Sequence, residues 1–156
     1  LLQRVLSEVL LALNSRIEAS GAVVSVTISP GLLLESYPGA MEQILFSLVE
    51  NALVHGLAGR ESGAINIVAS LSDGFVVLEI SDNGCGMVED VRKHAFDPFF
   101  TTRLGQGSSG LGLYLVHSLA TGTLHGHVEL LDTEGAGTAL RLTLPQRVGA
   151  SETAAR

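Results

Sequence analysis

Residues 64–87 read AINIVASLSDGFVVLEISDNGCGM, and this stretch decides how the chain folds. Apolar side chains alternate with polar or small ones from Ala64 to Leu71 and again from Phe75 to Ser81, which predicts two half-buried β-strands. Ser72-Asp73-Gly74 lies between them and is a turn signal. The sequence therefore predicts a β-hairpin at the centre of the domain.

The second of these strands ends on a carboxylate. Period-two alternation places Asp82 on the same face as the apolar residues of that strand, Val76, Leu78 and Ile80. A carboxylate there needs a partner, because burying an unpaired charge is costly, and the exocyclic amine of adenine is one candidate. Glycines in Asn83-Gly84-Cys85-Gly86-Met87 would let a flat ring approach the backbone. An ordinary Asp-Asn-Gly turn explains the same hexapeptide equally well.

The flanking sequence predicts the rest of the architecture. Apolar periodicity, a proline near a helix start and glycines just past two helix ends predict helices at 2–17, 38–55, 88–94 and 110–121. Further strands are expected at 23–28, 128–131 and 138–144, with the last two forming a hairpin. Strands and helices do not alternate strictly. We therefore expect an α/β (α+β) two-layer sandwich, with a mixed, mostly antiparallel sheet and helices on one face.

Composition and charge narrow the class of protein. The 156 residues fit a single domain, 1–145, and we expect the polar end, 146–156, to be a flexible tail. The net charge is −7 without a basic stripe, so nucleic-acid binding is not expected. No mainly apolar stretch of about 20 residues is present, so we expect a cytoplasmic domain without membrane contact. The single lysine, Lys93, follows Arg92, which excludes a G-x-x-x-x-G-K-[ST] phosphate loop.

The helix expected at 38–55 carries a candidate magnesium ligand. Ser47, Asn51 and His55 fall along one edge of its apolar stripe, whereas Glu50 points nearly opposite the centre of that stripe. The amide oxygen of Asn51 is a hard, neutral ligand of the kind that suits Mg²⁺. Taken alone, Asn51 fits an interior amide bonded to the backbone better than a metal ligand.

Two further segments combine glycines or aromatic residues with polar groups. Gly105-Gln106-Gly107-Ser108-Ser109-Gly110-Leu111-Gly112-Leu113 leads into the helix expected at 110–121, where free amide groups favour phosphate. Phe96-Asp97-Pro98-Phe99-Phe100-Thr101-Thr102-Arg103 places aromatic residues beside polar donors. Loops as long as 83–109 tend to be functional lids, and the aromatic segment is interpreted as the anchor of such a lid.

Taken in order, these segments resemble the catalytic ATP-binding domain of sensor histidine kinases, within the GHKL ATPase superfamily with its Bergerat-type fold. Residues 43–56 look like the N box, 82–86 like the D-x-G-x-G box, 96–103 like the F box and 108–113 like the G-x-G-L-G-L box. Residues 137–145 are similar to the closing strand of the family. The resemblance covers nearly the whole chain up to Pro145.

The resemblance implies ATP and Mg²⁺ as ligands. Asn51 would hold Mg²⁺ and act in catalysis with Arg103, Asp82 would read adenine, and Thr138 would support the adenine subsite. Thr102 and Arg103 could approach the phosphates. The full set of implied nucleotide-binding residues is Asn51, His55, Asp82, Gly84, Gly86, Met87, Phe99, Thr101, Thr102, Arg103, Ser109, Gly110, Leu111, Gly112, Leu113 and Thr138.

The chain departs from the family pattern at Ser47, Val54 and Ser108, where an asparagine, a basic residue and a glycine are usual. None of its five histidines lies in the His-Glu or His-Asp context of a phosphate acceptor. The resemblance therefore implies that the acceptor lies on the separate dimerisation domain of a homodimeric parent, with a response regulator downstream. Anchoring of the parent in the inner membrane is left open.

Three other functions share parts of this pattern. A GHKL hydrolase would carry a glutamate one helical turn before the magnesium asparagine, where this chain has Ser47. An anti-sigma-factor serine kinase shares the fold but typically lacks the F box. A degenerate nucleotide-binding module kept for docking is the third alternative, and measured ATP affinity would separate it from the others.

Overall fold

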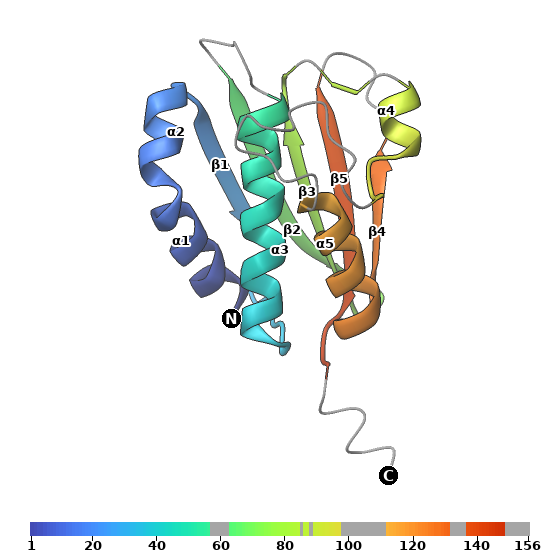
Figure 1. The fold of residues 1–156 in the computed structure, drawn as a ribbon. Coiled ribbons are helices and arrows are strands. Elements are labelled where there is room, and N and C mark those ends of the chain that lie inside the picture. The colour runs from blue at the N-terminus through green and yellow to red at the C-terminus, as the bar shows by residue number, and fades with distance from the viewer. Residues whose placement is uncertain (57–62, 85, 88, 98–111, 132–136, 149–156) are drawn as a thin grey trace.

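The structure is a computed structural model of the chain, and it describes residues 1–56, 63–84, 86–87, 89–97, 112–131 and 137–148. Within these residues a sheet forms one layer and helices cover one of its faces (Figure 1). The strands are β1 (Val23–Ile28), β2 (Ala64–Ser72), β3 (Phe75–Asp82), β4 (His127–Leu131) and β5 (Thr138–Pro145). Their spatial order is β1-β2-β3-β5-β4. Only the β1–β2 pair is parallel among the pairs described, which confirms the predicted mixed, mostly antiparallel sandwich.

The helices agree with the predicted positions but differ in detail. They are α1 (Leu2–Ala12), α2 (Asn14–Ser20), α3 (Pro38–Asn51), α4 (Glu89–Lys93) and α5 (Gly112–Ser118). Two π-helical turns, η1 (Ala52–Gly56) and η2 (Leu119–Thr123), extend α3 and α5. The first predicted helix is divided at Leu13, which is buried in the core between α1 and α2. None of the described helices combines the length and the hydropathy needed to cross a membrane.

The core lies between the sheet and the helices. Pro38 is at the start of α3, where its missing N–H costs nothing and its fixed φ suits the helix. The buried stripe of α3 packs on the inner face of the sheet, and that face is built from every second residue of its central strands. The main contributors are Met41, Ile44, Leu45, Leu48 and Val49 from α3, and Ile65, Ile67, Leu78, Ile80, Leu140 and Leu142 from the sheet.

The outer face of the sheet carries a row of charges. Glu79, Arg141 and Glu129 are direct cross-strand neighbours on β3, β5 and β4. The Nε of Arg141 donates to Glu79 Oε1 at 2.9 Å, and its NH1 group donates to Glu129 Oε1 at 3.4 Å. The hydrogen bond to Glu79 raises the pKa of the Arg141 guanidinium, and desolvation opposes this shift. Arg141 is therefore charged at every physiological pH.

The chain after β5 is paired with the segment before α3. The Glu35 N–H donates to the Gln146 carbonyl at 2.8 Å, and the Val148 N–H donates to the Glu35 carbonyl at 2.9 Å. Arg147 adds an ion pair with Glu35 at 3.6 Å. A flexible tail was expected from Gln146 onward, and in the structure the backbone groups of residues 146–148 bond to a loop distant in sequence. Residues 149–156 lie outside the described part of the chain.

Candidate nucleotide-binding site

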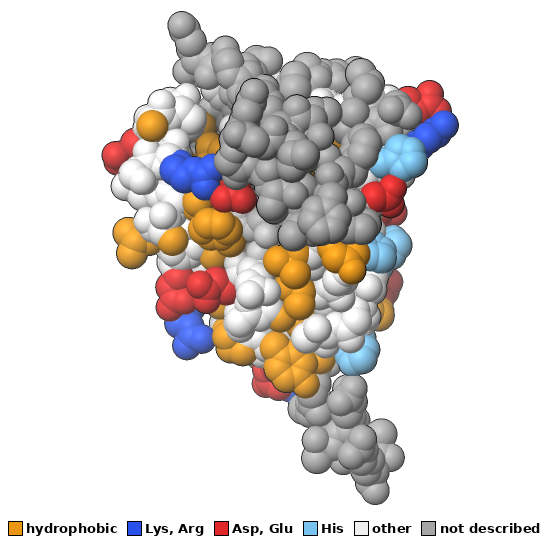
Figure 2. All heavy atoms as spheres, in the orientation of Figure 1, with side chains coloured by type: hydrophobic (Ala, Val, Ile, Leu, Met, Phe, Trp, Pro, Cys, Tyr) orange, Lys and Arg blue, Asp and Glu red, His pale blue; other side chains and the backbone are white. Residues whose placement is uncertain are grey.

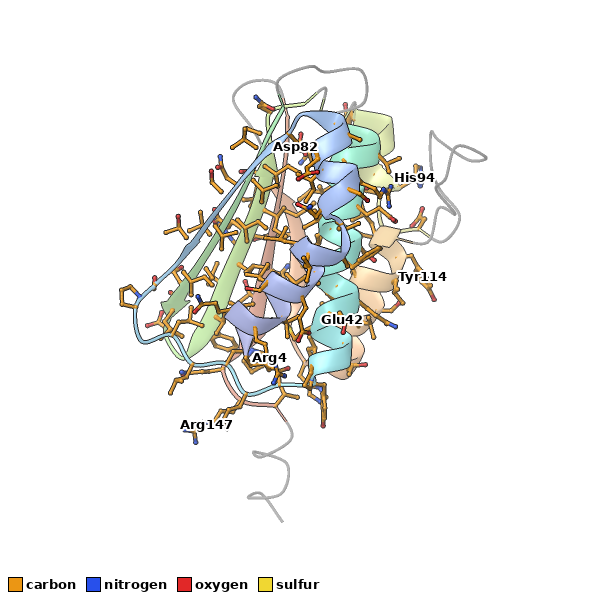
Figure 3. The ribbon with its side chains drawn as sticks, turned by 90° about the vertical axis from the view of Figure 1, so that its left-hand side faces the viewer. Arg4, Glu42, Asp82, His94, Tyr114 and Arg147 are labelled. Carbon is orange, nitrogen blue, oxygen red and sulfur yellow. The ribbon has the colours of Figure 1, made fainter. Side chains whose placement is uncertain are left out.

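Three predicted site residues lie at neighbouring ends of one helix and two strands. Asn51 is the last residue of α3, Asp82 the last of β3 and Thr138 the first of β5. Figure 1 shows these ends together at the upper end of the sandwich. In Figure 3 the side chain of Asp82 points from the sheet toward the helical layer. The fold thus gathers residues from distant parts of the sequence at one end of the domain.

The strand register places Asp82 directly opposite Thr138. Directly opposed residues of antiparallel strands have Cβ atoms about 4.5–5.5 Å apart, so the carboxylate and the hydroxyl are immediate neighbours. Thr138 is only 4% exposed and is the one buried polar residue among those described. It shares the inner face with Leu140 and Leu142. A carboxylate and a hydroxyl therefore stand together at the edge of an apolar surface.

A local turn orients the carboxylate. Asp82 Oδ1 accepts a hydrogen bond from the Gly84 N–H at 2.9 Å, which is the Asp-Asn-Gly turn that the sequence suggested. Asn83 joins the end of β3 to the start of β2: its Oδ1 accepts from the Ala64 N–H at 2.8 Å, and its N–H donates to the Ala64 carbonyl at 3.3 Å. This turn does not exclude ligand recognition by Asp82, because it holds the carboxylate in a fixed orientation.

Gly86 and Gly137 allow two backbone segments to approach each other. Gly137 has φ +113°, and a Cβ there would overlap the carbonyl oxygen of Asp82. Gly86 has φ +72°, and its Cβ would come within 2.9 Å of the Gly137 carbonyl oxygen. Gly86 therefore admits a neighbouring backbone segment, and the expectation that it also lets a flat ring approach stays a prediction. The role of Gly137 was missed, although a glycine directly before the strand that begins with Thr138 is a sign of close approach.

The described part of the predicted lid is packed on the core. Ala95 is buried, and Met87 and Phe96 are partly buried against the core. The ring of Phe96 also lies 5.6 Å from that of His117 on α5, measured between centroids. Residues 98–109 of the predicted lid lie outside the described residues, and for them the lid stays a prediction.

The helix carrying Asn51 changes its hydrogen-bond pattern at that residue. The Ala52 N–H is shared between the carbonyls of Leu48 and Val49, and η1 follows. We expected an α-helix as far as His55, but packing of η1 against β3 and α2 accompanies a wider turn here. π-Helical turns occur frequently at functional sites. Asn51 itself is half-buried, at the boundary between core and surface as predicted.

The neighbouring carboxylate, Glu50, is directed toward α2. Its Oε2 lies 2.7 Å from NH1 of Arg16 on α2. Glu50 and Asn51 are separated by about 100° around the helix axis, so their side chains diverge. The expectation that Glu50 points elsewhere than Asn51 agrees with this contact.

The remaining predicted site residues are only partly covered by the structure. The structure places Gly112 at the start of α5 and buries Leu113 in the core. His55 belongs to η1, but its side chain lies outside the described residues, as do Phe99, Thr101, Thr102, Arg103, Ser109, Gly110 and Leu111. Their roles stay predictions.

A groove of about 520 Å³ lies elsewhere, between α1 and β1. Residues from the start of α1 and the end of β1 line it, and none of the predicted site residues does. Among the described residues, no group of three or more His, Cys, Asp or Glu side chains is placed to hold a metal ion. The candidate site therefore consists of the ends of α3, β3 and β5, which carry Asn51, Asp82 and Thr138.

The fold is a mixed sheet covered on one face by helices, with polar side chains gathered at one end, and the comparisons name its family. The profile described as "Histidine kinase-, DNA gyrase B-, and HSP90-like ATPase" matches residues 37–148. The chain belongs to this GHKL family, as an ATP-binding domain of the histidine-kinase type.

Curated relatives agree with this assignment. The chain is 35% identical over 134 residues to the sensor histidine kinase component HK1 of Mycobacterium tuberculosis (strain H37Rv), and the match covers 84% of the chain and 76% of that protein. It has the same identity to a probable sensor histidine kinase of strain CDC 1551, of which it spans only 34%. An anti-sigma F factor of Clostridium botulinum is 37% identical, but over only 76 residues, or 49% of the chain.

Solved structures show the same fold. The catalytic domain of the histidine kinase ThkA has a TM-score of 0.81 at 22% identity, covering 93% of this chain and 92% of that one. Full-length ShkA, solved in complex with AMPPNP, has a TM-score of 0.78 at 26% identity and covers 93% of this chain and 30% of that one. ThkA has also been solved in complex with the response regulator TrrA.

Proposed function

We propose that this domain binds Mg-ATP at the end of the sheet marked by Asp82 and that, in its parent protein, it donates the γ-phosphoryl group to a histidine on a separate dimerisation domain. The phosphoryl group would then pass to a response regulator. The observation that carries the proposal is the cross-strand pair of Asp82 and buried Thr138. A fixed acceptor beside a hydroxyl, bordered by apolar side chains, suits the edge of adenine.

In this proposal each residue acts by holding a group in position. Asp82 accepts a hydrogen bond from the exocyclic amine, and Thr138 supports the same subsite. Asn51 supplies one oxygen ligand to Mg²⁺, whose other ligands would be phosphate oxygens and water. When bound, Mg²⁺ neutralises charge on the phosphates. Arg103, with Thr101 and Thr102, would approach the phosphates, so catalysis would rest on positioning and electrostatics.

The adenine assignment predicts a large effect of Asp82→Asn. Loss of a hydrogen bond to a charged group should weaken ATP binding roughly 10- to 100-fold and reduce the preference for ATP over GTP. Titration calorimetry with both nucleotides measures this. Asp73→Asn is a matched control in the β2–β3 turn, where φ of 51° tolerates asparagine. Equal affinity for ATP and GTP, unchanged in Asp82→Asn, would contradict the assignment.

The magnesium assignment predicts a different signature for Asn51→Ala. We define the magnesium benefit as the ratio of the dissociation constant for ATP in EDTA to that in Mg²⁺. This benefit should fall roughly tenfold or more, whereas binding in EDTA should stay near that of the wild type. Asn66→Ala, at an exposed position of β2, is the matched control. An unchanged benefit in Asn51→Ala would exclude Asn51 as a ligand.

The proposed function also implies partners for this domain. The dimerisation domain, the homodimeric parent and the response regulator are supported by the sensor-kinase relatives, and the known ThkA–TrrA complex supports the last of these. Because these kinases use cellular ATP, we place the domain in the cytoplasm. The serine-kinase alternative is supported only by the shorter match to the anti-sigma F factor. Measured ATP affinity would separate the docking-module alternative from the others.

A further inference from the structure

We propose that Arg16 is a positioning residue for Asn51, acting through its ion pair with Glu50. The inference rests on the proposed function, because it takes Asn51 as the magnesium ligand. It assigns to α2 the task of orienting the end of α3. Neither Arg16 nor α2 was among the predicted site residues.

The first observation is the contact itself. Arg16 NH1 donates to Glu50 Oε2 at 2.7 Å, and the two side chains are 44% and 34% exposed. It joins α2 to the last turn of α3, across a separation of 34 residues. Figure 2 shows acidic and basic side chains side by side on this helical face. The distance is that of a charge-assisted hydrogen bond.

The second observation is how little else fixes α2. This helix has no buried residue, and only Ile17 packs against the core from it as a partly buried apolar side chain. Gly21, in the left-handed conformation with φ 74°, ends it, and the turn at Leu13 separates it from α1. A helix with so little buried surface needs polar contacts to hold its place. The ion pair with Glu50 is such a contact, and α2 also touches η1.

The third observation is that the end of α3 departs from regular helix geometry. The Ala52 N–H shares its hydrogen bond between two carbonyls, and a π-helical turn follows. The backbone hydrogen bonds of α3 therefore do not by themselves fix the orientation of its last turn. Glu50 is the residue immediately before Asn51. Any rotation of the last turn of α3 that displaces the Glu50 carboxylate therefore displaces the Asn51 amide as well. Arg16 restrains that rotation from outside the helix.

Loss of the ion pair should change the stability of the domain little, but it should change the magnesium benefit for ATP measurably. Exposed ion pairs contribute little to folding, so Arg16→Gln should change the melting temperature by no more than a few degrees. A ligand for Mg²⁺ must be placed far more accurately, since this ion demands near-ideal octahedral geometry. We expect the magnesium benefit for ATP to fall by up to about fivefold, the factor equivalent to the upper range for such a pair.

The test measures the magnesium benefit and the melting temperature of five proteins: wild type, Arg16→Gln, Glu50→Gln, the exchanged pair Arg16→Glu with Glu50→Arg, and Arg147→Gln. Arg147 pairs with Glu35 in an exposed Arg–Glu contact at the other end of the domain from Asp82, so its variant is the matched control (Figure 3). The two single variants at the proposed pair change net charge in opposite directions. A reduced benefit in both therefore cannot be an effect of net charge on phosphate binding.

The expected result is a reduced benefit in Arg16→Gln and Glu50→Gln, recovery in the exchanged pair and no change in Arg147→Gln. A wild-type benefit in Arg16→Gln, while Asn51→Ala loses it, would overturn the positioning role and leave the proposed function intact. A wild-type benefit in Asn51→Ala would instead remove the magnesium assignment on which the inference rests. Equal weakening of ATP binding with and without Mg²⁺ in Arg16→Gln would also overturn it, because that pattern is not specific to the metal.

Discussion

Purified and incubated with γ-labelled ATP, this domain is expected to bind nucleotide, to release phosphate very slowly and to remain unlabelled. Labelling should appear only when the dimerisation domain of the parent, with its acceptor histidine, is supplied in cis or in trans. We expect no labelled histidine without the dimerisation domain and labelled histidine with it, which makes this the largest effect predicted for the chain. The measurement is autoradiography of the acceptor, together with release of inorganic phosphate.

The physical reason for slow hydrolysis is that, among the residues that the structure describes, no suitable base is placed near Asn51. A general base must lie within hydrogen-bond reach of the attacking water. One helical turn before Asn51 the chain has Ser47, whose hydroxyl is not a base at neutral pH. Glu50 is close in sequence, but its carboxylate lies 2.7 Å from the Arg16 guanidinium, which holds it toward α2.

The absence of self-labelling has a separate reason. None of the five histidines lies in the His-Glu or His-Asp context of a phosphate acceptor. Glu50→Gln is the informative variant for hydrolysis. Brisk phosphate release by the wild-type domain, lost in Glu50→Gln, would favour the hydrolase over the kinase. Labelling of the isolated domain would show that one of its own histidines is an acceptor.

Gly137→Ala is expected to lower the free energy of unfolding by roughly 2 to 6 kcal/mol, the sum of backbone strain and overpacking. At φ +113° the backbone is in a region that alanine rarely adopts, and the new Cβ would overlap the Asp82 carbonyl oxygen. The melting temperature should fall by on the order of 10 °C, measured by circular dichroism. ATP affinity should fall as well, because relief of the overlap moves the backbone that carries Asp82.

Gly39→Ala is the matched control for this substitution. Gly39 lies in the first turn of α3, and a Cβ there would meet nothing within 4 Å. Alanine favours the helix by up to about 1 kcal/mol, so stability should stay the same or rise slightly. A Gly137→Ala protein as stable as the Gly39→Ala protein would mean that the close approach of β3 and Gly137 is not required for folding.

Much of the architecture could be predicted from local patterns. Alternation predicted the hairpin of β2 and β3, and the pair of positive φ angles at Asp73 and Gly74 agrees with its turn signal. The same alternation placed Asp82 on the inner face, because side-chain direction along a strand depends only on the parity of the position. Helical periodicity placed Asn51 at the edge of a buried stripe for an equivalent reason.

What the sequence by itself determined, then, is which elements form and which face each residue occupies, since both follow from interactions between near neighbours along the chain. Only the tertiary structure decided the register that sets Asp82 against Thr138, the contact of Gly86 with Gly137, and the pairing of residues 146–148 with Glu35. It also decided that α3 widens at Ala52 and that Glu50 meets Arg16. These features join segments far apart in sequence, and their free energy depends on how whole layers pack, which no local pattern records.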